Sequence, residues 1–264
     1  MADRTSTVLV ARAPGVARVT LNRPDIRNAF NDVMIRELAA VFAALKDDPE
    51  LRVVVLTGAG SAFCAGADLQ WMGEVLSYTK EQNLRDSTAL ATLLREIYDF
   101  PRPVIGRING PAIGGGTGVT AVTDIAIASD DAVFSFSEVK LGLVPAVISP
   151  YVLKRVGERH AREYFLTGVR LTAADAVHCG LVNRVVPKAE LDGAVDEVVK
   201  HLLSSGPEAV MTCKRMVRDV AELSLDAAAP YTANIITELR MSAEGQEGMR
   251  AFLDKREPAW RSRS

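Results

Sequence analysis

The sequence has few aromatic residues, few cysteines and almost no net charge. Phe, Trp and Tyr make up 6% of its 264 residues, so Ala, Val, Leu and Ile must build the core. Its three cysteines, Cys64, Cys179 and Cys213, are an odd number without metal-ligand spacing, which is typical of buried thiols in a reducing compartment. The formal charge of −2 gives no general attraction to nucleic acid or to an anionic membrane, and we expect neither as a partner.

Long hydrophobic runs are also absent. No stretch approaches the roughly 18 apolar residues that would indicate a membrane span, and the charged N-terminus has no signal-peptide core. We therefore expect a cytoplasmic protein. Without repeats, low-complexity tracts or a Pro-, Gly- or Ser-rich linker, the simplest organisation is a catalytic core over residues 1–200 with a helical C-terminal region over residues 201–264.

Strand and helix patterns alternate through the first half of the chain. Residues 8–21 predict a hairpin that turns at Pro14-Gly15, and Asn31 is expected to cap a helix ending near Lys46. Strands are predicted over residues 51–58, 103–110, 124–129 and 132–136, and helices up to about Tyr78 and over residues 82–100. From Ser149 onward the pattern is helical except at residues 180–187. This order indicates an α/β fold with a helical extension.

Two loops share one design, in which a buried strand leads through small residues into a helix. They are "VVVLTGAGSAFCAGADL" (53–69) and "VIGRINGPAIGGGTGV" (104–119). A helix N-terminus presents free N–H groups, so two such loops side by side could form an oxyanion hole. Tight packing of a helix on the sheet, without any ligand, would explain the glycines equally well. Neither a phosphate loop nor the G-x-G-x-x-G dinucleotide pattern is present.

Six stretches in order, from about Val8 to Trp260, carry a resemblance to a known family. They are "LNRPDIRNAFN", "FCAGADL", "INGPAIGGGTGVTAVTDIAIAS", "FSFSEVKLGLVP", "LTGVRLTAADAVHCGLVNRVVP" and "EGQEGMRAFLDKREPAW". The chain resembles the crotonase family of enoyl-CoA hydratases and isomerases. This resemblance implies a ββα spiral core with a helical C-terminal trimerisation region, often paired into hexamers. It also implies an acyl-CoA thioester substrate, no metal, and no cofactor beyond the coenzyme A of the substrate.

The resemblance further implies roles for particular residues. Ala67 and Gly115 would give the two oxyanion N–H groups, and Glu138 would be the acid/base residue. Gly118 stands where the family's hydratases carry their other glutamate. A capping box, Ser135-x-x-Glu138, is the alternative explanation of the glutamate.

The resemblance also implies where coenzyme A would be held. The resemblance implies backbone contacts from the loop and charged contacts from two basic regions, so the candidate binding residues are Arg27, Ala65, Ala67, Asp68, Leu69, Gln70, Gly115, Gly118 and Lys255. Arg23 and Arg256 lie in the same basic regions. For Asp68 we favour a structural role, because it opens a helix where a carboxylate is stabilising. Trp71 and Met72 either line the acyl pocket or pack in the core.

Because the chain has one of the family's two glutamates, the sequence does not decide between hydration and isomerisation. Glu138 could hydrate a 2-enoyl-CoA with help from another polar group or a water near Gly118, or it could move one proton in an isomerisation. A missing side chain at Gly118 could also admit a branched or carboxylated acyl group. We favour hydration, because "ADLQWM" and "SEVKLGLVPAVISPYV" resemble methylglutaconyl-CoA hydratases. A weakly catalytic CoA- or RNA-binding member of the family is a third possibility, which the near-neutral composition does not favour.

Overall fold

The main sheet begins with the predicted hairpin. In a computed structural model, which describes residues 6–261, β1 (Val8–Ala13) and β2 (Val16–Leu21) pair antiparallel. The strands β3 (Val53–Gly58), β4 (Val104–Ile108), β6 (Ile125–Ser129) and β9 (Arg184–Val186) follow in parallel, giving the order β1-β2-β3-β4-β6-β9. Residues 1–5, in which no leader is predicted, lie outside the described residues.

A second, smaller layer accompanies the main sheet. It contains β5 (Ala112–Ile113), β7 (Val133–Ser135) and β8 (Arg170–Thr172), and the isolated pairs Phe30–Ala67 and Cys64–Ala112 extend it. The chain therefore passes repeatedly from a main strand through a short second-layer segment into a helix. This arrangement is the predicted ββα spiral. Strand β8 corrects the prediction of an unbroken helical pattern around residue 170.

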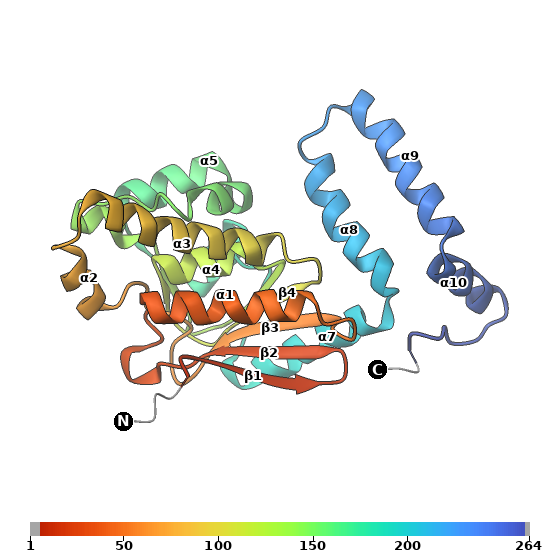
Figure 1. The fold of residues 1–264 in the computed structure, drawn as a ribbon, viewed down its shortest axis with the longest axis horizontal. Coiled ribbons are helices and arrows are strands. Elements are labelled where there is room, and N and C mark those ends of the chain that lie inside the picture. The colour runs from red at the N-terminus through yellow and green to blue at the C-terminus, as the bar shows by residue number, and fades with distance from the viewer. Residues whose placement is uncertain (1–5, 262–264) are drawn as a thin grey trace.

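The described part of the chain forms ten α-helices, of which α8, α9 and α10 lie to one side of the sheets (Figure 1). They are α1 (Asp32–Lys46), α2 (Leu69–Val75), α3 (Lys80–Tyr98), α4 (Gly115–Val122), α5 (Ser149–Thr167), α6 (Ala173–His178), α7 (Leu191–Ser204), α8 (Pro207–Val220), α9 (Leu225–Met241) and α10 (Ala243–Leu253). The Asn31 side chain accepts a hydrogen bond from the Met34 N–H and caps α1 as predicted. Helix α2 ends at Val75, three residues before the predicted end at Tyr78.

The central strands of the main sheet are buried on both faces. Along β3, Val54 and Leu56 belong to the large core cluster with α1, α3, α4 and α5, whereas Val53 and Val55 pack with α7 residues on the other face. A strand covered on both sides is a continuous apolar run, which explains the sequence of residues 51–58. Helix α4 is almost wholly buried between the two layers and α5, so its N-terminus is held in a fixed position.

The C-terminal helices extend away from the sheets. Helices α8 and α9 lie side by side in Figure 1, at the opposite end of the molecule from α2. Lys214 on α8 donates to the carboxylate of Asp124 (2.6 Å), which joins α8 to the core beside the C-terminal end of α4. Helix α7 runs through residue 200 to Ser204. The division at residue 200 remains a prediction. No helix within residues 6–261 is long and apolar enough to cross a bilayer.

Candidate active site

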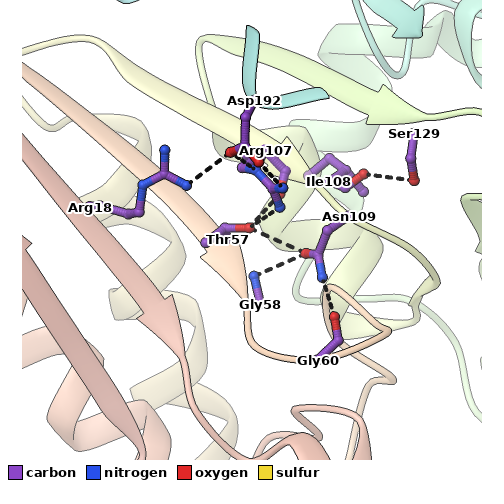
Figure 2. Close-up of polar contacts among 9 residues, drawn as sticks. All are labelled: Arg18, Thr57, Gly58, Gly60, Arg107, Ile108, Asn109, Ser129 and Asp192. Atoms are coloured by element: carbon purple, nitrogen blue, oxygen red, sulfur yellow. Dashed lines mark hydrogen bonds and ion pairs between the residues drawn. The ribbon is translucent and has the colours of Figure 1, made fainter. Parts of the chain in front are cut away.

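Two buried asparagines fix the loop that follows β3. Figure 2 shows the Asn109 side-chain oxygen accepting hydrogen bonds from the Gly58 N–H (3.1 Å) and the Thr57 hydroxyl (3.2 Å), while its amide nitrogen donates to the Gly60 carbonyl (3.1 Å). From the other side, the Asn28 amide nitrogen donates to the carbonyl oxygens of Ala59 and Ala62, at 2.8 and 2.9 Å. The loop therefore enters residues 64–68 in one defined conformation.

Ala67 and Gly115 come together around Phe30. The Phe30 N–H donates to the Gly66 carbonyl (2.7 Å), and the Phe30 carbonyl accepts from the Asp68 N–H (2.8 Å). Phe30 also reaches the second loop, since its ring lies 3.6 Å from where a Cβ on Gly115 would be. Within residues 6–261 the N–H groups of Ala67 and Gly115 have no protein acceptor. The structure thus brings the two predicted donors close to the same residue, Ala67 beside the Phe30 backbone and Gly115 beside the Phe30 ring.

Backbone conformation and close packing explain some glycines of the second loop but not all of them. Gly114 has a φ of +51°, which favours glycine. A Cβ on Gly116 would lie 2.2 Å from the Cys64 carbonyl oxygen, whereas one on Gly115 would meet nothing closer than the Phe30 ring. Close packing therefore explains Gly116. It does not explain Gly115, the first residue of α4, which is only half-buried.

Arg155 satisfies the opposite end of α4. Its guanidinium donates to the carbonyl oxygens of Ala121 (3.1 Å) and Asp124 (3.3 Å) and also to that of Thr123. The last carbonyls of a buried helix need such donors, and a cation there also complements the helix dipole. Sequence reasoning gave no role to Arg155, because it lies 31 residues or more from these partners.

The Glu138 carboxyl lies beside the N-terminus of α4. Its Oε1 is 3.1 Å from where a Cβ on Gly114 would be, and its buried Oε2 has no hydrogen-bond partner among the described residues. Burial raises the pKa of Glu138. The capping-box alternative is wrong, since Phe136 caps the 3₁₀ segment Ser137–Leu141 and no side chain makes a capping bond there.

The space next to Gly118 is filled. A Cβ on Gly118 would lie 2.1 Å from Cγ2 of Ile148 and 2.7 Å from its Cβ. Ile148 is 3% exposed and belongs to the large core cluster. The expectation that a missing side chain at Gly118 leaves room for a water or an acyl branch is therefore wrong, because Ile148 occupies that position.

Asp68 has the structural role that the sequence predicts. Its Oδ1 accepts from the Gln70 N–H (2.8 Å) and caps α2, while its Oδ2 pairs with Arg23 at 2.7 Å. Arg23 also donates to the Ala29 carbonyl (2.6 Å), so its guanidinium is already engaged. Buried Cys64 lies beneath the second loop, and burial raises the pKa of its thiol to about 12, which excludes a thiolate nucleophile near neutral pH.

The other predicted coenzyme A residues separate into two groups. Arg27 is exposed and its carbonyl accepts from the Ala65 N–H (2.9 Å), while Leu69 and Gln70 are exposed just after Ala67. Lys255, by contrast, follows α10, which lies at the far end of the molecule from α2 (Figure 1). Within one chain, Lys255 does not join the loop.

The side chains of Arg256 and Trp71 both contact other parts of this chain. Arg256 forms a two-pronged pair with Glu247, at 2.6 and 2.8 Å. Trp71 packs against the core, although its Nε1 has no acceptor among the described residues. A cleft of about 580 Å³ elsewhere, between the hairpin turn, the end of α7, α8 and Trp260, contains none of the predicted residues.

Fold and site together define a class: a spiral α/β protein with two free N–H groups and one unpaired carboxyl near the N-terminus of a buried helix. A family model described as enoyl-CoA hydratase/isomerase matches residues 11–263. The chain therefore belongs to the enoyl-CoA hydratase/isomerase family, which confirms the predicted resemblance, the spiral fold and the prediction of an enzyme.

Individual relatives match over almost the whole chain. The short-chain-enoyl-CoA hydratase of Clostridium acetobutylicum is 32% identical over 257 residues, covering 95% of this chain and 96% of that protein. The carnitinyl-CoA dehydratase of Proteus mirabilis is 34% identical over 254 residues, covering 94% and 95%. The crystal structure of an enoyl-CoA hydratase from Shewanella pealeana has a TM-score of 0.93 at 38% identity and 96% coverage of both chains.

Proposed function

We propose that this enzyme adds water to a 2-enoyl-CoA thioester, with Glu138 as its acid/base residue. The observation that carries the proposal is the Glu138 carboxyl beside the N-terminus of α4, whose buried Oε2 has no hydrogen-bond partner among the described residues. A carboxylate kept without a partner costs stability, so its position is best explained by a reaction. The Ala67 and Gly115 N–H groups would bind the thioester oxygen and stabilise the enolate that forms when C3 is attacked.

A single carboxyl can complete the proton balance. The Glu138 carboxylate takes a proton from water as the water oxygen bonds to C3, and electrons of the double bond move to the thioester oxygen. When the enolate collapses, the Glu138 carboxyl returns a proton to C2, so that the net change is addition of one water. A raised pKa suits a group that must both accept and donate a proton.

Isomerisation of a 3-enoyl-CoA is the second candidate. The specific observation in its favour is the aliphatic Ile148 at the Gly118 position, which leaves Glu138 without a second carboxyl there. Moving a proton from C4 to C2 needs one base, whereas hydration also needs a positioned water.

The acyl chain and the coenzyme contacts complete the proposal. The sequence resemblance favours a branched or carboxylated acyl group such as methylglutaconyl. Space at Gly118 no longer supports this choice, because Ile148 fills it. Backbone groups of Ala65 and Ala67–Gln70 would hold the adenine end, Arg27 would approach a phosphate, and no cofactor beyond the substrate's coenzyme A is required. Lys255 can take part only from a neighbouring subunit, which agrees with the proposed trimer or hexamer.

A substrate panel tests these proposals. Purified protein is given crotonyl-CoA, 3-methylglutaconyl-CoA and a 3-enoyl-CoA, and the enoyl absorbance and products are followed. Loss of absorbance with formation of a 3-hydroxyacyl-CoA supports hydration. Conversion of the 3-enoyl ester alone would replace hydration by isomerisation, and no turnover of any ester would contradict both.

A further inference from the structure

The face of α4 that points into the site can be followed residue by residue. A Cβ on Gly114 would meet Glu138, one on Gly115 would meet Phe30, and one on Gly118 would meet Ile148. Gly114 is the non-helical cap, with a φ of +51°, whereas positions 115 and 118 are three residues apart within α4 and lie on the same side of the helix, about one turn apart. Ile148 therefore covers the side of α4 that Phe30 covers at Gly115, about one turn further along.

Ile148 is rigidly held in this position. It precedes α5, and its carbonyl accepts from the N–H groups of Tyr151 and Val152, each at 3.2 Å. The segment from Glu138 to Ile148 is short and folded on itself, since the Leu143 N–H donates to the Glu138 carbonyl (3.0 Å). One segment thus supplies both the carboxyl that lies against Gly114 and the aliphatic group that lies against Gly118.

From this arrangement we infer that Ile148 is a specificity-determining residue, which sets the size of the acyl substituent that fits beside the Glu138 carboxyl. The inference rests on the proposed function, in that the C2 and C3 atoms of the acyl group must lie within reach of Glu138. A substituent on C3 then points toward the wall of α4 where Ile148 fills the space left by Gly118. The wall is aliphatic and already closely packed, so it accepts small apolar groups and has no partner for a charged one.

The test measures binding of two saturated thioesters that cannot be hydrated. Butyryl-CoA and 3-methylbutyryl-CoA differ by one methyl group on C3, and their dissociation constants are determined by calorimetry for the wild type, Ile148→Val and Ile148→Ala. We expect the affinity ratio to shift toward the branched ester in the order of side-chain size, by about 10-fold for Ile148→Ala. Ile148→Val keeps the branched shape and removes one methyl group, so it remains informative if the alanine variant does not fold.

A matched control separates this role from simple core packing. Ile127 is 1% exposed and lies in the cluster on the opposite face of the sheet. Ile127→Val should lower thermal stability as Ile148→Val does and leave the affinity ratio unchanged. An equal ratio in the wild type and both Ile148 variants would overturn the inference. Because binding is measured without turnover, failure of the hydration assay would leave this result interpretable.

Discussion

At the scale of single residues, Glu138 combines a buried oxygen that has no partner with a position beside the N-terminus of α4. Trp71 Nε1 and Asp86 Oδ2 are also buried without a partner among the described residues, whereas the buried side chains of Asn28 and Asn109 are hydrogen-bonded, as most buried polar groups are. Glu138 instead keeps a buried oxygen free and has a raised pKa. Its chemistry and its cost to stability can therefore be measured separately.

Replacing the carboxyl by an amide should remove turnover and keep binding. Glu138→Gln preserves shape but can neither accept nor return the proton, so we expect kcat to fall by about 10²-fold or more. The dissociation constant of butyryl-CoA should change little. Exposed Glu96 on α3 provides the control, since Glu96→Gln should leave both quantities unchanged. A Glu138→Gln enzyme with wild-type kcat would show that another group carries the proton.

The same substitution should stabilise the protein near neutral pH. Because the folded-state pKa of Glu138 is raised, the folded protein holds its proton more tightly than the unfolded chain does. Wild-type stability is therefore greatest, in this respect, below about pH 4 and falls as the pH rises through the folded pKa. Glu138→Gln does not titrate, so its melting temperature should exceed that of the wild type at pH 7, with the difference shrinking toward pH 4. A difference that does not depend on pH would contradict the assigned cause.

Roles that depend on neighbouring residues could be predicted from the sequence, whereas roles that depend on contacts between distant segments were missed. The structural role of Asp68 could be predicted because it depends on local order, at the start of a helix. The acid/base role of Glu138 came from the family resemblance and stays a prediction, whereas its local pattern indicated a capping box that the structure does not contain. No role was predicted for Asn28, Asn109 or Arg155, although the first two stand in the stretches that carry the resemblance. Their partners are distant carbonyl groups that only the fold brings near. Ile148 resembles any core residue until its contact with Gly118 is seen.

At the scale of elements, helix α4 connects the core to the site. Its C-terminal carbonyls are bound by Arg155, and the N–H of its first residue, Gly115, has no acceptor among the described residues. Gly115→Pro removes this donor at a position, the first of a helix, where proline is tolerated. We expect turnover to fall by about 10²-fold. Ala243→Pro, at the first residue of α10, is the matched control and should keep full activity. A folded and fully active Gly115→Pro enzyme would rule out the oxyanion role of Gly115.

The contact between α4 and the start of α5 should appear as energetic coupling. Gly118→Ala places a methyl group 2.1 Å from Ile148, so overpacking should cost about 1–3 kcal/mol of unfolding free energy. Ile148→Ala creates a cavity and also destabilises, by about 2–5 kcal/mol. In the double variant the new methyl group enters the vacated space, so the combined loss should be smaller than the sum of the two. Denaturant unfolding of the four proteins measures the coupling, and strict additivity would contradict the contact.

The elements themselves show where sequence patterns are sufficient. The β1–β2 hairpin, β3 and the capped start of α1 were predicted because each has a strong local pattern. Strand β8 has three residues and pairs only with β7, so no periodicity within residues 170–172 could indicate it. The order of the strands likewise depends on pairing between distant segments and was not predicted, whereas the family resemblance implied that the two glycine loops approach each other.

At the scale of the whole molecule, the C-terminal helices are attached to the core and expose apolar surface. Lys214 and Arg218 on α8 pair with Asp124 and Asp99 of the core. Beyond this attachment, large apolar side chains on α9 and α10 are exposed, among them Leu225 (89%), Met241 (78%), Phe252 (83%) and Leu253 (77%). Apolar surface of this kind favours burial against another protein surface.

Assembly should therefore be measurable and linked to coenzyme A binding. We expect a trimer or a hexamer by light scattering at micromolar concentration, and smaller species for Phe252→Glu with Leu253→Glu, because buried charges without partners disfavour the interface. Leu9→Glu, on the exposed edge strand β1, is the control and should assemble normally.

The position of Lys255 connects this assembly to the site. It follows α10, which lies at the opposite end of the molecule from α2 in Figure 1, so we expect it to reach coenzyme A from a neighbouring subunit. Lys255→Gln should then weaken binding of butyryl-CoA in the assembled protein and have no effect in the Phe252→Glu, Leu253→Glu background, where the neighbour is absent. Equal weakening in both backgrounds would place Lys255 at the site of its own subunit, and no weakening in either would remove it from the coenzyme A site.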